Sequence, residues 1–323
     1  MISSFKVPSI RDIVSSSNRI QQYIHKTPVL TSTSINELIG ASLYFKCENY
    51  QKVGAFKIRG ATNAILQLND KEKTNGVVTH SSGNHGQAIA LAAKWFNSKA
   101  YIIMPENSAK PKIEAIRGYG AEIIFCGPTQ RDREVTVENL ITKTNAHFIH
   151  PYDDDRIICG QATAAKEFME EMPDLDYIIA PIGGGGLISG TILSAQYFNP
   201  KTKIIGVEPQ EVDDAYQSLK AGVLQKNGTI NTLADGLRAS LSERTFSIIK
   251  NGIHEIITIS EAEMIKAMRL VWERMKIIIE PSSATVMAAA LKQKEKLKGK
   301  KIGLIITGGN VDLEALPFTT HSY

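Results

Sequence analysis

Short apolar runs alternate with segments of helical periodicity along most of the chain. Seven runs have the length of a strand and mostly end at Gly, Pro or polar residues: 43–47, 76–80, 100–104, 121–125, 177–182, 203–207 and 301–307. Buried parallel strands have this continuous apolar character. Between them, segments such as 85–96 and 261–276 repeat apolar residues at helical spacing. The alternation predicts an α/β fold with parallel sheets.

No Pro/Gly/Ser linker divides the chain into domains, so one domain is expected to be inserted in the other. Residues 71–150 contain three strand–helix units, which is enough for a small doubly wound sheet. We therefore expect residues 1–70 and 151–323 to form a large domain. Residues 71–150 would be the small domain within it.

Composition and charge exclude several classes of function. The 323 residues carry a net charge of +4 and no basic block interleaved with aromatic residues, so no nucleic-acid partner is expected. Cys47, Cys126 and Cys159 are an odd number and form no CxxC pair, which argues against a disulfide framework or a zinc site. We find no signal peptide and no membrane-spanning run, and we expect a cytoplasmic protein without a membrane partner.

Two glycine-rich turns each follow a predicted strand and precede a predicted helix: SSGNHG (81–86) and GGGGLISG (183–190). Helix N-termini attract anions, and four successive glycines let N–H groups converge on one, so the second turn predicts a phosphate site. It is not a Walker A loop, because no Gly-Lys-Ser/Thr follows. It also lacks the full Rossmann spacing, but Glu208 at the end of the next strand leaves dinucleotide binding open.

Lys57 lies between Phe56 and Ile58, where a helix is predicted to begin. Apolar residues recur from there at helical spacing: Ile58, Ala61, Ile65 and Leu68. Apolar neighbours and the positive end of the helix dipole both disfavour the ammonium form. A lysine with a lowered pKa is a usable amine nucleophile and Schiff-base former. Together with a phosphate-binding turn, it indicates pyridoxal 5′-phosphate, which needs both.

The ring nitrogen of that cofactor needs a partner as well. Thr307 ends the last predicted strand, at the edge of the sheet where ligands of α/β proteins bind. A hydroxyl does not enforce a charged ring nitrogen as an aspartate would. This favours α-proton chemistry and elimination.

Four segments together, GAFKIRGATNA (54–64), SSGNHGQA (81–88), GGGGLISG (183–190) and TGGNVD (307–312), resemble the fold-type II pyridoxal-phosphate enzymes. The nearest branch is that of the serine and threonine dehydratases. Matching pieces also occur at 26–32, 206–209, 232–241 and 270–281, so the resemblance covers essentially the whole chain. It implies a tryptophan synthase β-like fold with two doubly wound open sheets, a homodimer, and a free amino acid as the substrate.

The resemblance also implies roles for individual residues. Lys57 would hold the cofactor and act as the base on one face of the substrate, and Ser82 would stand on the opposite face. Phe56 would pack beside the cofactor ring, and Asn84 would contact its 3′-oxygen. The loop for the substrate carboxylate would be Ser81, Ser82, Gly83, Asn84 and His85. The phosphate cradle would be Gly183, Gly184, Gly185, Gly186 and Leu187, and Thr307 stands where the family usually has Ser or Cys.

Two further sites follow from the resemblance alone. The first is a divalent cation, Mg²⁺ or Ca²⁺, on the side chains of Glu208 and Asp214 and the carbonyl of Val212. Without the resemblance, this acidic turn would be interpreted as solvated. The second is a nucleotide such as ATP, bound at a dimer interface near Lys52, Gln87 and Tyr119.

Three positions depart from the family pattern: Cys159, Ala162 and Ser283. They leave the fine choice of substrate open. The leading hypothesis is racemisation of serine, with elimination to pyruvate and ammonia as a second activity. The runner-up is a dehydratase acting on threonine or threo-3-hydroxyaspartate. From a different class, a non-catalytic or dinucleotide-binding α/β protein is the third hypothesis.

Overall fold

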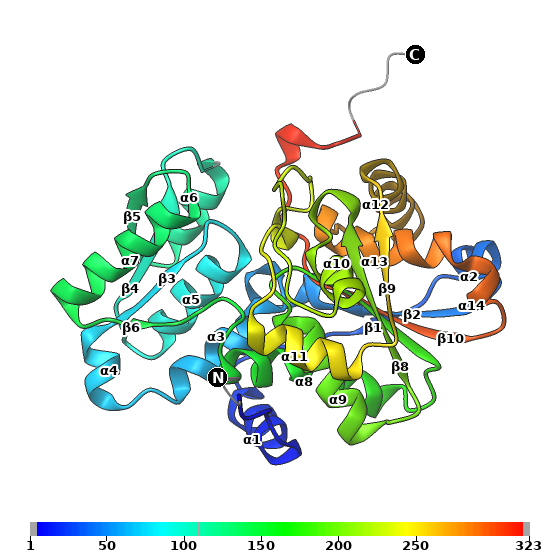
Figure 1. Ribbon diagram of the computed structural model, residues 1–323, viewed down its shortest axis with the longest axis horizontal. Coiled ribbons are helices and arrows are strands. Elements are labelled where there is room, and N and C mark those ends of the chain that lie inside the picture. Colours follow the sequence, from blue (N-terminus) through cyan, green and yellow to red (C-terminus); the bar gives the residue numbers. More distant parts are fainter. Residues whose placement is uncertain (1–4, 109, 319–323) are drawn as a thin grey trace.

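The computed structural model describes residues 5–108 and 110–318, and the strands form two separate sheets (Figure 1). The larger sheet has the order β1 (Val29–Leu30), β2 (Ser42–Cys47), β10 (Lys301–Ile306), β7 (Tyr177–Pro181), β8 (Lys203–Pro209) and β9 (Glu255–Ile259). The smaller sheet has the order β5 (Glu122–Cys126), β4 (Ala100–Pro105), β3 (Val77–His80) and β6 (His147–Phe148). Only β1, in the described part of the chain, runs antiparallel to its neighbour. The α/β prediction with two open sheets is confirmed.

All seven predicted strands are present, with ends shifted by at most two residues. Three more strands, β1, β6 and β9, were not predicted. The first two contain two residues each, which is too short for a periodic pattern. The third lies at the edge of the large sheet and mixes half-buried with buried positions, so it lacks a continuous buried run.

Helices cover both faces of the large sheet. One face carries α13 (Pro281–Lys292), with α12 (Glu261–Met275), α2 (Thr33–Ile39) and α14 (Lys294–Leu297) around it. The other carries α9 (Gly186–Phe198), with α8 (Asp155–Glu171), α1 (Ile10–Ile20) and α11 (Glu243–Gly252). The first ten residues of α9 are all buried, because this helix lies between the sheet and α8. The short helix α10 (Asp214–Ala221) follows β8.

The small sheet is also covered on both faces. On one side lie α5 (Asn84–Trp95), α6 (Lys110–Gly118) and α3 (Lys57–Leu66), and on the other lies α7 (Gln130–Thr144). The short helix α4 (Asp70–Asn75) precedes β3. The four strands of the small sheet lie within residues 77–148, and the six strands of the large sheet lie outside that range. The domain boundaries at 70 and 150 stay a prediction, because α3 packs against both α5 and α8 and so joins the two sheets.

A buried cluster of charges anchors α3 to the large sheet. The Arg59 guanidinium donates to both carboxylate oxygens of Glu48 (2.7 and 2.8 Å) and to both of Glu167 (2.7 and 2.8 Å). Lys46 donates to Glu167 at 3.0 Å. Two positive and two negative groups thus balance each other. Such pairing offsets the large cost of removing charges from water.

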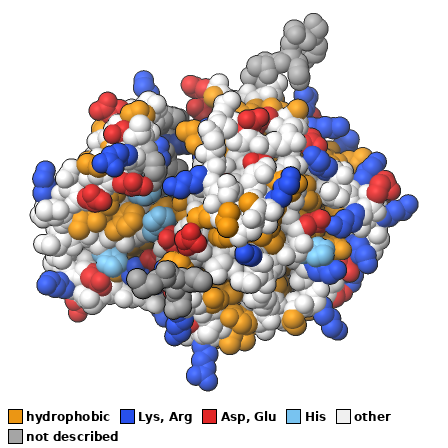
Figure 2. All heavy atoms as spheres, in the orientation of Figure 1, with side chains coloured by type: hydrophobic (Ala, Val, Ile, Leu, Met, Phe, Trp, Pro, Cys, Tyr) orange, Lys and Arg blue, Asp and Glu red, His pale blue; other side chains and the backbone are white. Residues whose placement is uncertain are grey.

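The surface is ordinary in its charge distribution. On the face drawn in Figure 2, Lys and Arg side chains are interspersed with Asp and Glu. All three cysteines are free and buried. Among the described residues, the helices are too short or too polar to cross a bilayer.

Candidate functional site

A cleft of about 1020 Å³ lies between the two sheets, at the ends of strands from both of them. Its walls come from the loops after β3, β7 and β10 and from the start of α3. Parallel strands commonly present ligand sites at their carboxyl ends. Most residues singled out in the sequence line this cleft: Phe56, Lys57, Ser81, Ser82, Gly83, Asn84, His85, Gly183, Gly184, Gly185, Gly186, Leu187 and Thr307.

Lys57 begins α3, as expected, and its amine is enclosed. The Nζ donates to the carbonyl oxygen of Pro151 at 3.1 Å and lies 5.2 Å from the centre of the Phe56 ring. Burial lowers the pKa of Lys57 to about 8, although the nearby carboxyl of Glu280 acts in the opposite direction. The predicted helix is also confirmed, although it is buried on all sides from Ile58 to Ile65 rather than along one apolar face. Lys57 is thus an amine that loses its proton more readily than a surface lysine does.

The four-glycine turn fits a phosphate group. It joins β7 to α9, whose first-turn N–H groups have no acceptor within the helix. A Cβ on Gly184 would lie 2.3 Å from the Tyr152 ring, and one on Gly183 would lie 2.9 Å from the Gly236 carbonyl oxygen. Gly185 has a φ of +88°, which strains any residue with a side chain. Side chains are therefore excluded here, and the bare backbone faces the cleft.

Thr307 lies at the end of β10, where the resemblance places the partner of the cofactor ring nitrogen. It is buried, and its hydroxyl is 2.8 Å from the hydroxyl of Ser283. The Ser283 hydroxyl in turn accepts from the backbone N–H of Gly308 at 2.8 Å. The departure at Ser283 therefore adds a second hydroxyl behind Thr307.

The loop from Ser81 to His85 connects β3 to α5 and forms another wall of the cleft. The Ser81 hydroxyl accepts from the backbone N–H of Gly83 at 3.3 Å, which bends the chain there. The Ser82 side chain is half-buried and faces the same cleft as Lys57. His85 is buried beneath the loop, and burial followed by the charge of Lys57 lowers its pKa well below the usual value.

The most informative residue missed in the sequence is Glu280. It is buried in the cleft wall and accepts hydrogen bonds from the Asn84 amide. Burial, followed by the charge of Asp235, raises the pKa of Glu280 to about 8. The available signal was a glutamate between the apolar run at 277–279 and a helix-starting proline, a position where a charged side chain is out of place.

Glu208 and Asp214 are both buried, so the acidic turn is not a solvated one. Glu208 accepts from the backbone N–H groups of Ala215 and Tyr216 (3.1 and 2.8 Å). Asp214 accepts from the N–H of Leu241 through Oδ2 at 2.8 Å, while its Oδ1 is buried without a hydrogen-bond partner. Burial raises the pKa of both carboxyls, and their mutual repulsion adds to that of Glu208. The free Oδ1 beside a second carboxyl suits an oxygen-binding cation.

The three residues expected at a nucleotide site have different surroundings. Gln87 is buried and lines the cleft, whereas the Lys52 amine lies 5.0 Å from the centre of the Trp95 ring. Tyr119 packs partly buried against the core of the small sheet. The nucleotide site stays a prediction.

The departures at Cys159 and Ala162 lie away from the cleft, in the packing of α8. Both residues are buried. Ala162 contacts α9 at Gly190. A Cβ on Gly190 would lie 2.7 Å from the backbone nitrogen of Ala162, so the glycine lets the two helices approach closely here.

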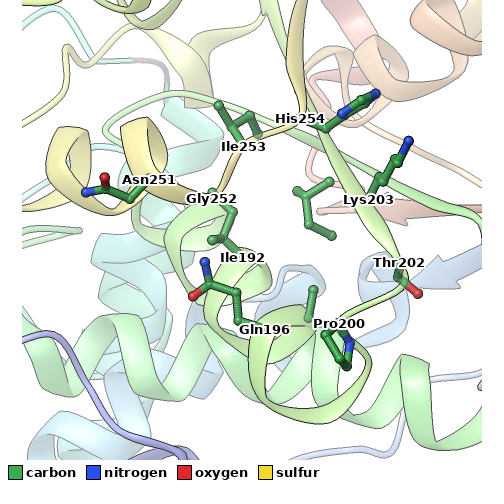
Figure 3. Close-up of a pocket in the computed structure, with 11 residues that line it drawn as sticks. Ile192, Gln196, Pro200, Thr202, Lys203, Asn251, Gly252, Ile253 and His254 are labelled. Atoms are coloured by element: carbon green, nitrogen blue, oxygen red, sulfur yellow. The ribbon is translucent and has the colours of Figure 1, made fainter.

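A second pocket, of about 360 Å³, lies between α9, β8 and the segment after α11 (Figure 3). Ile192, Gly252 and Ile253 lie around its centre, and the polar side chains of Asn251 and Thr202 stand at its rim. It contains neither a buried charged group nor a glycine-rich turn. The cleft between the sheets is therefore the candidate active site.

The cleft combines the elements that a phosphate-bearing aldehyde needs. Lys57 offers an amine for the aldehyde, the turn at 183–186 offers N–H groups for the phosphate, and Thr307 offers a hydroxyl for a ring nitrogen. Ser82 adds a hydroxyl to the lining of the same cleft. These residues fit pyridoxal phosphate and a reaction at the α-carbon of an amino acid.

Comparison with known proteins agrees with this geometry. The chain is 51% identical over 312 residues to a serine racemase of Dictyostelium discoideum, covering 95% of this chain and 96% of the relative. It is 45% identical to a beta-hydroxyaspartate dehydratase of Paracoccus denitrificans, covering 97% and 99% of the two chains. The crystal structure of the Dictyostelium serine racemase superimposes with a TM-score of 0.91 over 95% of this chain and all of that one. The family model "Pyridoxal-phosphate dependent enzyme" matches residues 20–308, and the chain belongs to this family.

Proposed function

We propose that this protein is a serine racemase that interconverts L- and D-serine and also eliminates water from serine to give pyruvate and ammonia. The observation that carries the proposal is the half-buried Lys57 amine, with a pKa lowered to about 8, in a cleft that it shares with the Ser82 hydroxyl. The 51% identity to a serine racemase supports the choice of substrate. The isomerase and ammonia-lyase activities would share one site.

Different residues of the cleft would bind the cofactor and the substrate. The backbone at Gly183–Leu187 would hold the phosphate, and Phe56 would pack against the ring. Pyridoxal phosphate, when bound, supplies the aldehyde that links to the substrate amine and the electron sink that makes the α-proton acidic. The loop at 81–85 would bind the substrate carboxylate through its N–H groups.

The released Lys57 amine would then remove the α-proton from one face, and its lowered pKa suits it to act as a base. If Ser82 returns a proton to the other face, the product is the mirror-image amino acid. If the β-hydroxyl leaves instead, the products after hydrolysis are pyruvate and ammonia. The same two side chains therefore serve both reactions.

One observation favours the runner-up, a dehydratase of threonine or threo-3-hydroxyaspartate. Arg133 lines the cleft, and its buried Nε has no hydrogen-bond partner among the described residues. A guanidinium in this place could pair with the second carboxylate of hydroxyaspartate. The similarity to a beta-hydroxyaspartate dehydratase agrees with this alternative.

Four further features belong to the proposal. Glu208, Val212 and Asp214 would hold Mg²⁺ or Ca²⁺, supported by the buried free oxygen of Asp214. ATP as an activator bound near Lys52, Gln87 and Tyr119, and the homodimer, rest on the resemblance. The cytoplasmic location rests on the three free cysteines.

The test is direct. The purified protein should be yellow, and borohydride reduction should fix the cofactor on Lys57, as shown by peptide mass spectrometry. Chiral chromatography and release of the keto acid (pyruvate, 2-oxobutyrate and oxaloacetate, respectively) should then be measured with serine, threonine and threo-3-hydroxyaspartate side by side. A colourless protein that binds NAD would contradict the proposal, and turnover of hydroxyaspartate without racemisation of serine would favour the runner-up.

A further inference from the structure

A carboxyl group lies in the wall of the cleft without a cation to pair with. Glu280 immediately precedes the first residue of α13, and only 3% of its surface is exposed. Within the described part of the chain, no ion pair includes it, and its hydrogen bonds come from the Asn84 amide and the backbone of Asn310. Burying an unpaired carboxylate is costly, and a neutral carboxylic acid avoids that cost.

The hydrogen bonds of Glu280 fix the orientation of the Asn84 amide. The Asn84 Nδ2 donates to both carboxyl oxygens of Glu280, at 2.9 and 3.0 Å. The Asn84 Oδ1 accepts from the Asn310 Nδ2 at 2.8 Å, and that nitrogen also donates to the carbonyl oxygen of Val53 at 2.7 Å. If the amide were turned over, its oxygen would face the carboxyl oxygens of Glu280, and its NH₂ group would face the NH₂ group of Asn310.

Counting hydrogens shows what remains free. An amide nitrogen carries two hydrogens, and one N–H that donates to the carbonyl oxygen of the neutral acid, with the hydroxyl oxygen beside it, accounts for both distances to Glu280. The second N–H of Asn84 is then available to a ligand in the cleft that this residue lines. The resemblance places the 3′-oxygen of the cofactor beside Asn84.

Close backbone approach encloses this arrangement. A Cβ on Gly308 would lie 2.7 Å from Oε1 of Glu280, and a Cβ on Gly54 would lie 2.7 Å from Oδ1 of Asn310. Because Gly308 and Gly54 have no side chain, the backbone at these positions packs directly against the side chains of Glu280 and Asn310. Glu280 is therefore held in one place.

We propose that Glu280 is a positioning residue of the active site: as a neutral acid it holds the Asn84 amide so that one N–H points to the bound cofactor. The proposal rests on the proposed function, because it assumes that pyridoxal phosphate occupies the cleft. The raised pKa of Glu280, about 8, supports the neutral form at pH 7. The charged groups that act on it are Asp235 and, with the opposite sign, Lys112 and Lys57.

The test compares Glu280→Gln with Glu280→Ala in the cofactor-loaded protein. Gln keeps an uncharged acceptor for Asn84, so its absorption spectrum at pH 7 should match the wild type. The wild type should show a spectral transition as the pH rises through about 8, and the Gln variant should lose it. Ala should shift the spectrum and weaken pyridoxal phosphate binding about tenfold, as expected for one lost buried hydrogen bond.

Matched variants control for folding. Glu261→Gln changes a glutamate that accepts from Thr232 and Leu233 and does not line the cleft, so the spectrum and its pH dependence should stay as in the wild type. Asn310→Ala frees Oδ1 of Asn84 without touching the Glu280 side chain. It should shift the spectrum in the direction expected for Glu280→Ala, so the proposal can be tested even if Glu280→Ala does not fold.

Two results would overturn the proposal. One is a wild-type spectrum and cofactor affinity in both Glu280→Ala and Asn310→Ala. The other is a Gln variant as impaired at pH 7 as the Ala variant, which would mean that a charged carboxylate is needed. Failure of the proposed function is a separate outcome, because the wild-type protein itself would then bind no pyridoxal phosphate or turn over no serine.

Discussion

Lys57 and Arg59 are two positive residues at the start of the same helix, and their surroundings differ completely. Arg59 is met by the carboxylates of Glu48 and Glu167 in the packed junction of α3 with α8. Lys57 is met by one carbonyl oxygen, that of Pro151, on the side of the cleft. The net effect of these surroundings is to raise the pKa of Arg59 and to lower that of Lys57 to about 8.

The difference separates a structural charge from a reactive one. Arg59 is completely buried and Lys57 is half-buried, but only Arg59 receives enough opposite charge to offset the loss of hydration. The Lys57 ammonium has too little negative charge around it to offset its lost hydration, so it gives up its proton more easily. A shift of two residues along one helix turns the side chain from the packed interface to the cleft.

Replacing Lys57 by alanine should have the largest effect. The variant loses both the attachment point of the cofactor and the base, so racemisation and elimination should fall below detection. Lys57→Arg should fail as well, because a guanidinium stays charged and cannot attach the aldehyde. Chiral chromatography and pyruvate release measure both reactions, and ordinary turnover in either variant would refute the role of Lys57.

Replacing Ser82 by alanine should separate the two reactions. Racemisation needs a proton donor on each face of the α-carbon, whereas elimination from L-serine needs only Lys57. Formation of D-serine should fall by ~10²–10⁴-fold, the usual loss for a positioned acid–base group. Pyruvate release from L-serine should continue at a substantial rate, and that from D-serine should fall with racemisation.

The measurement uses both assays on one preparation, after the absorption spectrum has shown that the cofactor is bound. Undiminished racemisation would rule out the two-base mechanism. Equal loss of both reactions of L-serine would instead show that Ser82 mainly positions the substrate.

Replacing Arg59 by methionine should damage the fold more than the chemistry. It leaves Glu48 buried without its main partner, and breaking a buried pair costs about 3–5 kcal/mol of unfolding free energy. Denaturant unfolding measures the loss. The fraction that stays folded should still bind pyridoxal phosphate, so loss of cofactor at unchanged stability would show that Arg59 acts on the site itself.

Acid should destabilise the loop that holds the Lys57 amine. Burial, followed by the charge of His80, lowers the pKa of His150 from 6.5 to about 4, and its Nδ1 accepts from the backbone N–H of Asp153 at 2.8 Å. Between these two pKa values the unfolded chain binds the proton and the folded protein does not. Stability should therefore fall as the pH drops from about 6.5 to 4, by roughly 3 kcal/mol from this residue.

Melting temperatures of the wild type and His150→Gln at pH 7 and pH 5 test this expectation. The variant has no proton to gain, so its melting temperature should depend less on pH. An equal pH dependence in both proteins would mean that other groups carry the effect.

Removing the proposed divalent cation should have the smallest effect and should act on stability. Chelation leaves the buried carboxyls of Glu208 and Asp214 facing each other, so the melting temperature should fall by several degrees and recover with Mg²⁺ or Ca²⁺. Asp214→Asn should abolish this response. An Asn variant that still gains stability from the metal would place the cation elsewhere.

The sequence by itself determined the features that arise within one strand–turn–helix unit. Lys57 in the first turn of its helix, the four glycines between β7 and α9, and Thr307 at the end of β10 were all predicted, since each depends on a few neighbouring residues. Seven of the ten strands could be predicted for the same reason. The family resemblance supplied the roles that these local patterns leave open.

Only the tertiary structure decided which distant residues meet. Glu280 and Asn84 are 196 residues apart in the chain, yet the amide of one lies against the carboxyl of the other. Ser283 meets Thr307 because α13 packs against β10, and Asp214 meets the N–H of Leu241 from another loop. A short pattern carries no information on such contacts, because the packing of whole helices and strands sets them. The burial that perturbs Lys57 and Glu280 is fixed in the same way.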